Sequence, residues 1–228
     1  MAPDSKPARV GAWAGIVGPA LFVLVFTVEG WLRPGYEPAR MYVSALSMGP
    51  RGWIQISSFL VAGLSFLLFA RAIAAEFPTG AASRAGPILF FVMGVVLLCS
   101  GPMVMDPQGT PIQQMTWHGL THQILGAIFF SLCPVTCFVF LRRFLGDPAW
   151  KSLRAWTLIA GVAIVAAIVL MKVATLPPPP APPGPLHPWV GLIQRVALVA
   201  FMGWVFSLGW AILERAKTAS PAQLREGA

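Results

Sequence analysis

The residues best suited to chemistry in this chain lie in one short stretch between two long apolar runs. Asp106, one of only eight acidic residues, is followed by His118 and His122, two of the three histidines. Residues four apart share one face of a helix, so the two imidazoles are predicted to point the same way. Two imidazoles and a carboxylate are ligands that zinc accepts, and a catalytic zinc keeps one further position for water. His118, His122 and Asp106 are therefore a candidate metal site that could activate water against an ester or amide.

Each of these residues also has an ordinary structural explanation. Asp106 precedes Pro107 and could simply end a helix. A histidine pair at this spacing can line a wet cavity without binding anything. Haem is disfavoured, because both histidines lie on one segment and His187 lies in a loop. The sequence leaves open whether zinc or any other cofactor binds, and whether the protein is an enzyme.

The composition is that of an integral membrane protein. Of 228 residues, 57% are hydrophobic and 11% are charged, and the mean hydropathy is +0.73. A soluble domain carries about a quarter charged residues. The long runs are continuously apolar rather than alternating, which disfavours a β-barrel. Although the net charge is +8, the basic residues lie in short loops between the runs, so we expect no nucleic-acid partner and a lipid bilayer as the surroundings.

The apolar runs predict an all-α fold, a bundle of six transmembrane helices without an attached soluble domain. The expected organisation is an N-terminal tail over 1–9, a transmembrane domain over 10–213 and a C-terminal tail over 214–228. The spans are expected at about 10–31, 52–70, 87–105, 117–141, 155–175 and 189–213. Pro102 is predicted to kink the third span, and residues 42–47 could form a short interfacial helix. The proline-rich run 177–185 favours an extended conformation in water.

The distribution of basic residues predicts the orientation of the bundle. Eleven lysines and arginines lie in the two tails and the second and fourth loops, against four at the opposite end: Arg33, Arg40, Arg51 and Lys172. This bias predicts that both termini are cytoplasmic, in a bacterial inner membrane.

With this orientation, the ionisable groups inside or beside the spans gather toward the outer end. Glu29 ends the first span, Asp106 ends the third, His118 and His122 open the fourth, and Arg195 lies early in the sixth. A charge within a span costs several kcal/mol unless it is paired or wetted. Arg195 is therefore expected to pair with Glu29 or Asp106. With the neighbouring Gln194, these residues form the candidate ligand-binding set: Glu29, Asp106, His118, His122, Gln194 and Arg195.

Three short motifs resemble a known family. They are Arg33-Pro-Gly-Tyr36 followed by Ser44-Ala-Leu46, the Asp106 … His118-Gly-Leu-Thr-His122 region, and Gly191-Leu-Ile-Gln-Arg195. They resemble the six-span prokaryotic membrane proteins of the family called domain of unknown function 998, a resemblance that implies a compact six-helix bundle and brings no settled activity. The His-x-x-x-His element is more distantly similar to membrane-embedded zinc hydrolases of the ceramidase and progestin-receptor-like superfamily. Those enzymes use a third histidine, which no span supplies here.

The sequence thus predicts a membrane protein with a polar pocket that opens outward and binds a small ligand or a lipid head group. Two alternatives stay open: a zinc-dependent membrane hydrolase that uses His118, His122 and Asp106, and a structural or accessory subunit whose charges only form ion pairs. The substrate, the oligomeric state and the role of the proline-rich loop are not specified by the sequence.

Overall fold

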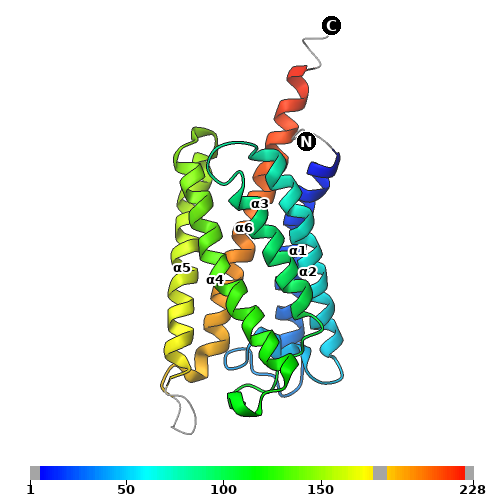
Figure 1. The fold of residues 1–228 in the computed structure, drawn as a ribbon, viewed down its shortest axis with the longest axis vertical. Helices are drawn as coiled ribbons and strands as arrows, with labels where there is room; N and C mark the ends of the chain where they lie inside the picture. Colours follow the sequence, from blue (N-terminus) through cyan, green and yellow to red (C-terminus); the bar gives the residue numbers. More distant parts are fainter. Residues whose placement is uncertain (1–5, 177–183, 224–228) are drawn as a thin grey trace.

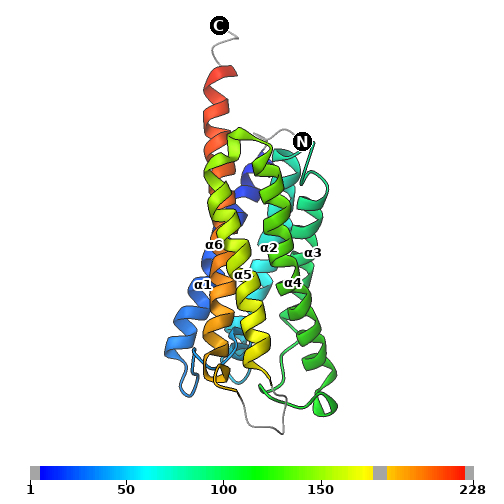
Figure 2. The same cartoon turned by 90° about the vertical axis from the view of Figure 1, so that its left-hand side faces the viewer.

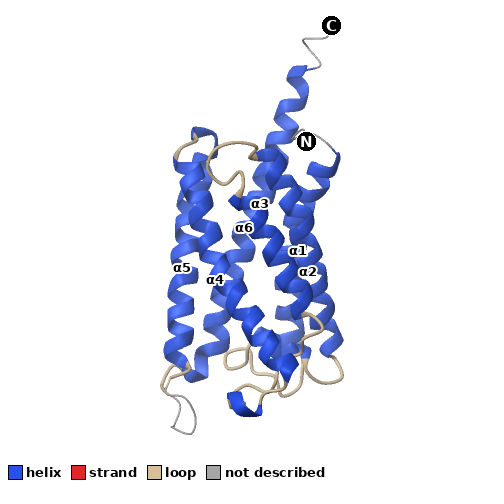
Figure 3. Ribbon diagram, in the orientation of Figure 1, coloured by secondary structure: helices blue, strands red, loops and turns tan. Residues whose placement is uncertain are grey.

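A computed structural model describes residues 6–176 and 184–223, with side chains as far as residue 216 at the C-terminal end. Helices and loops make up the whole of this described part (Figure 3). The six α-helices are α1 (Lys6–Leu32), α2 (Gly52–Glu76), α3 (Ala85–Ser100), α4 (Trp117–Leu145), α5 (Arg154–Ala174) and α6 (Val190–Gln223). Four short 3₁₀ helices are η1 (Val43–Ser47), η2 (Ile112–Gln114), η3 (Pro148–Leu153) and η4 (His187–Trp189). The predicted all-α, six-helix fold is confirmed.

Each helix packs against the next one along the chain, and α6 returns to pack against α1 (Figures 1 and 2). The six helices therefore close a ring, with the start of α1 and the end of α6 at the same end of the bundle. Five segments, those containing α1, α2, α4, α5 and α6, are long and apolar enough to cross a membrane, while α3 has only 16 residues. The chain is a multi-pass membrane protein.

Aromatic side chains fill the centre of the ring. Phe66 and Phe69 of α2, Phe90 of α3, Phe140 of α4 and Trp204 of α6 are all fully buried. The ring centroids of Phe69 and Phe90 are 4.8 Å apart, and those of Phe140 and Trp204 are 5.6 Å apart. The outer faces of the helices expose mostly aliphatic side chains, with some tryptophans and phenylalanines among them. In water such a surface would be unfavourable, but lipid tails are as apolar as leucine.

A close crossing holds α2 against α3. A Cβ atom on Gly63 would lie 2.7 Å from the carbonyl oxygen of Gly94, and one on Gly94 would lie 2.9 Å from that of Gly63. Both distances are shorter than real Cβ contacts allow. Two glycines facing each other therefore let the backbones meet, as is common for helices packed in membranes.

Helix α3 ends before Pro102 rather than continuing through it as a kinked span to residue 105. The last helical residue is Ser100, and the N–H of Gly101 closes the helix on the carbonyl of Leu97. Gly101 still has helical dihedral angles (φ −56°, ψ −63°), but Pro102 has no N–H with which to continue the helical hydrogen bonds. Residues 101–116 consequently form a long loop that crosses the end of the bundle opposite the start of α1 and contains η2.

The remaining helix bounds differ from the expected spans mainly at their ends. Helix α6 extends to Gln223, past the expected start of the C-terminal tail at residue 214. The expected interfacial helix over 42–47 is the 3₁₀ helix η1. Most of the proline-rich run, residues 177–183, lies outside the described residues, and its predicted extended conformation stays a prediction.

Candidate functional site

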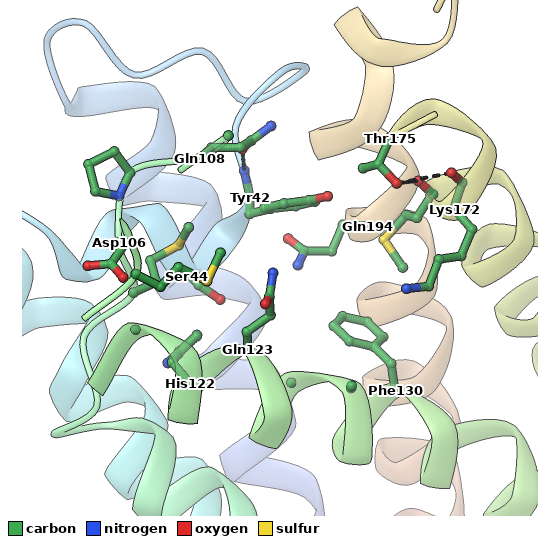
Figure 4. Close-up of a pocket in the computed structure, with 18 of the residues that line it drawn as sticks. Tyr42, Ser44, Asp106, Gln108, His122, Gln123, Phe130, Lys172, Thr175 and Gln194 are labelled. Atoms are coloured by element: carbon green, nitrogen blue, oxygen red, sulfur yellow. Dashed lines mark hydrogen bonds between the residues drawn. The ribbon is translucent and has the colours of Figure 1, made fainter. Parts of the chain in front are cut away.

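A cavity of about 390 Å³ lies at the end of the bundle opposite the start of α1, between α4, α5 and α6 (Figure 4). The loop that follows α3 and the loop that follows α1 cover it. Its lining comes from Tyr42 and Ser44, residues 105–109 and 115, α4 between Gly119 and Ser131, α5 between Ile168 and Lys172 with Thr175 beyond it, and Gln194 of α6. A volume of this size is within the range of small-ligand sites in proteins.

Of the six candidate ligand-binding residues, three belong to the described lining of this cavity: Asp106, His122 and Gln194. The described lining does not include Glu29, His118 or Arg195. The structure thus brings half of the predicted set together at the cavity, while the side chains of the other half have hydrogen-bond partners elsewhere.

Two arginines hold the carboxylate of Glu29: Arg33, four residues later in the chain, and Arg51, at the start of α2. Its Oε1 atom is 2.9 Å from Nη2 of Arg33, and its Oε2 atom is 2.6 Å from Nη2 of Arg51. The glutamate is only 4% exposed. Arg33 also donates to the carbonyls of Leu46 and Met48, at 2.7 and 3.0 Å. This cluster fastens the end of α1 to the loop that leads into α2.

The predicted pairing of Arg195 with Glu29 or Asp106 is wrong. The guanidinium of Arg195 donates instead to backbone carbonyls, with Nη1 at 2.6 Å from the oxygen of Pro38 and 3.0 Å from that of Met41. Its Nη2 atom donates to the hydroxyl of Tyr36. The carboxylate of Glu29 is occupied by nearer arginines, while the loop after α1 offers several carbonyls at the depth of Arg195. This arginine therefore fixes the loop onto α6.

A glycine one turn earlier makes that contact possible. A Cβ atom on Gly191 would lie 2.4 Å from the carbonyl oxygen of Met41 and 2.6 Å from that of Pro38. The bare backbone of Gly191 lets the loop approach α6 closely enough for Arg195 to reach the same two carbonyls.

Asp106 and His118 belong to the network that begins α4. Asp106 accepts hydrogen bonds from the N–H of Thr116 at 2.8 Å and from its hydroxyl at 2.9 Å. Thr116 is the N-cap of α4 and accepts from the N–H of Gly119. Nδ1 of His118 is 2.9 Å from the carbonyl oxygen of Val104. A capping threonine stabilises a helix start by satisfying an unpaired N–H, and here the aspartate positions that threonine.

His122 lies one turn further along α4 and forms part of the cavity wall. Its side chain is largely buried, at 6% exposure, and Nδ1 is 3.3 Å from the carbonyl oxygen of Ser100. Its ring meets that of Phe59 edge-on, with centroids 5.9 Å apart. The two imidazoles thus bind different carbonyls, at Val104 and Ser100, and the carboxylate of Asp106 is directed to Thr116.

These residues do not fit a zinc ion. Among the described residues no group of three histidine, cysteine, aspartate or glutamate side chains is placed to hold a metal. Cys133 and Cys137, which share a face of α4, are buried against the other helices.

The cavity contains polar residues that were not in the predicted site. Lys172, Gln123 and Tyr42 line it together with Gln194 (Figure 4). Lys172 was visible in the sequence as a basic residue near the end of an apolar run, but there it contributed only to the orientation. Gln123 could have been noticed as an uncharged polar residue beside His122 in the fourth span. Tyr42 and Ser44 lie in the stretch that the sequence predicts as a short interfacial helix, so their hydroxyls could have been expected at this end.

Two glutamines hold the cover of the cavity in place. The Gln108 side chain bridges the loop after α3 to the loop after α1, accepting from the N–H of Tyr42 at 3.2 Å and donating to the carbonyl of Arg40 at 3.1 Å. The Gln194 side chain accepts from the N–H of Val43 at 2.7 Å. Burial raises the pKa of the Tyr42 hydroxyl above its usual value. A phenol with its ordinary pKa near 10 is already protonated at neutral pH, and the upward shift leaves it so; the hydroxyl can therefore donate into the cavity.

A model of the family described as "Protein of unknown function (DUF998)" matches residues 16–211 of the chain. No curated protein and no solved structure gives a match. The match covers most of the sequence, so the chain belongs to this family, as its motifs predicted. None of these comparisons supports the resemblance to membrane-embedded zinc hydrolases.

Proposed function

We propose that this DUF998 protein binds a small ligand or a lipid head group in the cavity between α4, α5 and α6. The observation that carries the proposal is the cavity of about 390 Å³ itself, lined by polar side chains from five separate segments at one end of an otherwise apolar bundle. Polar groups at membrane depth are costly unless they have a partner or meet water, so their concentration around one cavity favours a binding role.

The site we propose combines part of the predicted set with the newly recognised residues. Asp106, His122 and Gln194 are retained, and Tyr42, Gln123 and Lys172 are added. Glu29, Arg195 and His118 support the site from outside, because they fix the loops and the helix start that cover it. With the orientation predicted from the basic residues, the cavity opens on the outer side of the bacterial inner membrane.

The two alternatives find less support. A zinc hydrolase needs its ligands to converge, whereas His118 and His122 bind separate carbonyls and Asp106 caps α4 through Thr116. A purely structural subunit accounts for the ion pairs of Glu29. It gives no reason for an open cavity that has a lysine and three glutamines in its wall.

Filling the cavity tests the proposal. A Cβ atom on Gly126, in the cavity wall, meets nothing within 4 Å, so Gly126→Leu places an isobutyl group in the cavity without a clash at its base. Native mass spectrometry of mildly solubilised protein should show a bound molecule in wild type that this variant loses. The matched control is Ala166→Leu, on the exposed outer face of α5, which should keep the molecule. Equal occupancy in all three proteins, or an empty wild type, contradicts the proposal.

A further inference from the structure

We infer that the ligand of this cavity is an anionic amphiphile, whose phosphate or carboxylate pairs with Lys172 and whose hydrocarbon part lies against α4 and α5. This inference rests on the binding role proposed above and adds the chemical class of the ligand. It depends on the charge inside the cavity, the direction of the hydrogen-bond donors and the change from polar to apolar lining.

Lys172 is the cation of the described lining. It lies in the last turn of α5, and its side chain runs into the cavity toward Phe130 (Figure 4). None of the ion pairs or hydrogen bonds among the described residues uses its ammonium group. A lysine near the end of a span ordinarily extends toward water or lipid head groups. Here the side chain, although exposed, runs toward Phe130 in the cavity wall (Figure 4), where an anionic group would neutralise its ammonium.

Asp106, the carboxylate in the same lining, does not neutralise Lys172. Both oxygens of Asp106 accept hydrogen bonds from Thr116, one from the N–H and one from the hydroxyl. Figure 4 places Asp106 and Lys172 on opposite sides of the cavity. Because the aspartate is committed to the start of α4, the positive charge on Lys172 is the one available to a ligand.

Two neutral polar groups of the lining, Gln194 and Tyr42, can add hydrogen-bond donors beside the ammonium. The oxygen of the Gln194 amide must face the N–H of Val43, since an N–H only donates. Its NH₂ group is thereby left for the cavity. The hydroxyl of Tyr42 points toward Gln194 (Figure 4), and its raised pKa keeps it a donor. An ammonium, an amide NH₂ and a phenol together suit the oxygens of an anion.

The deeper part of the cavity is apolar. Phe130, Ile168 and Met171 line it on α4 and α5, and the seven helical steps from Ile168 to Thr175 rise about 10 Å. Such a wall gives a free inorganic anion no partner, whereas it would bury a hydrocarbon chain. A polar end with donors above an apolar wall matches a head group attached to an acyl chain, taken from the surrounding bilayer.

The experiment measures binding of single-chain lipids to the full-length protein in detergent by native mass spectrometry. Lysophosphatidylglycerol and lysophosphatidylcholine of equal chain length are titrated separately, and inorganic phosphate is added as a competitor. We expect the anionic lipid to bind more tightly than the zwitterionic one, and millimolar phosphate to leave it bound. Equal affinities for the two lipids, or complete displacement by phosphate, would overturn the assignment of an anionic amphiphile.

Three lysine variants test the contact itself. Lys172→Gln should weaken binding of the anionic lipid by about tenfold or more, the loss expected when a charged hydrogen-bond partner is removed. Lys172→Arg should retain most of the affinity. Lys151→Gln, an exposed lysine on η3, should bind as wild type does. Unchanged affinity in Lys172→Gln contradicts the inference.

Gly126→Leu separates failure of this inference from failure of the binding role. Should Lys172→Gln bind normally while Gly126→Leu loses the lipid, the cavity is the site but the ligand is not selected by its charge. If the lipid also binds Gly126→Leu as it binds wild type, the cavity is not the site and both proposals are wrong.

Discussion

Arg51 donates to both carboxylate oxygens of Glu29, from Nε to Oε1 at 2.8 Å and from Nη2 to Oε2 at 2.6 Å. The first oxygen is shared with Arg33, one helical turn after the glutamate. A bidentate arginine–carboxylate pair fixes orientation as well as distance. This contact therefore sets where the loop after α1 turns into α2, and with it the position of η1 beside the cavity.

Glu29→Gln should destabilise the protein clearly. The substitution removes the negative charge while the Arg33 side chain, 13% exposed, stays in place. Loss of hydrogen bonds to a charged group costs roughly 1.5–3 kcal/mol. Unfolding in mixed micelles with increasing dodecyl sulfate would measure the change. Glu37→Gln is the control, because Glu37 and Arg40 form an i,i+3 pair with both side chains about 60% exposed, and surface pairs contribute about 1 kcal/mol or less. Equal effects of the two substitutions would contradict this account.

Arg195→Met should lower stability without a selective effect on lipids. Arg195 donates to three backbone carbonyls, those of Pro38, Met41 and Gly191, and each would lose its partner in the variant. We expect a lower free energy of unfolding, by roughly 1–3 kcal/mol for buried acceptors left unsatisfied, and partial recovery in Arg195→Lys. At temperatures where the variant is folded, its preference for anionic over zwitterionic lysolipid should equal that of wild type. A lost preference would mean that Arg195, rather than Lys172, selects the ligand.

The helices could be predicted from the sequence because each depends on local properties. A run of about 20 uncharged apolar residues has few alternatives to a membrane helix, whatever the rest of the chain does. The end of α3 was misjudged because the apolar run continues through Met103 and Met105, whereas proline geometry ends the helix at Ser100.

The site was harder to predict, because it depends on how loops fold over the helix ends. Arg195 and Glu29 lie at similar depths, which made a pair plausible. The loop 33–51 contains both Arg51, which pairs with Glu29, and the backbone carbonyls to which Arg195 donates. Lys172 was overlooked because spacing shows that a lysine is near the end of a span but not whether its side chain turns inward or outward.

Two glycines of α4 should respond oppositely to alanine. A Cβ atom on Gly119 would lie 2.1 Å from Oδ2 of Asp106, so Gly119→Ala must displace the aspartate that positions Thr116. We expect destabilisation of about 1 kcal/mol or more, the usual cost of a lost N-cap. Gly126→Ala meets no atom within 4 Å and should stabilise the helix by about 0.5–1 kcal/mol through its backbone preference. Unfolding of both variants in mixed micelles measures the difference. An unchanged stability of Gly119→Ala would show that Asp106 does not hold the N-cap threonine in place.

The orientation of the bundle can be tested with single cysteines at its two ends. Gln113 lies on η2 in the loop that covers the cavity, and Ser152 lies on η3 at the opposite end; both are exposed. The end of the bundle that carries Ser152 has the excess of lysine and arginine, which predicts that this end is cytoplasmic. In a background with Cys99, Cys133 and Cys137 replaced, a membrane-impermeant maleimide added to intact spheroplasts should label Gln113→Cys. Ser152→Cys should react only after the membrane is opened, since the reagent reaches cytoplasmic thiols no other way. The reverse pattern would turn the cavity toward the cytoplasm, and its lipid would then come from the inner leaflet.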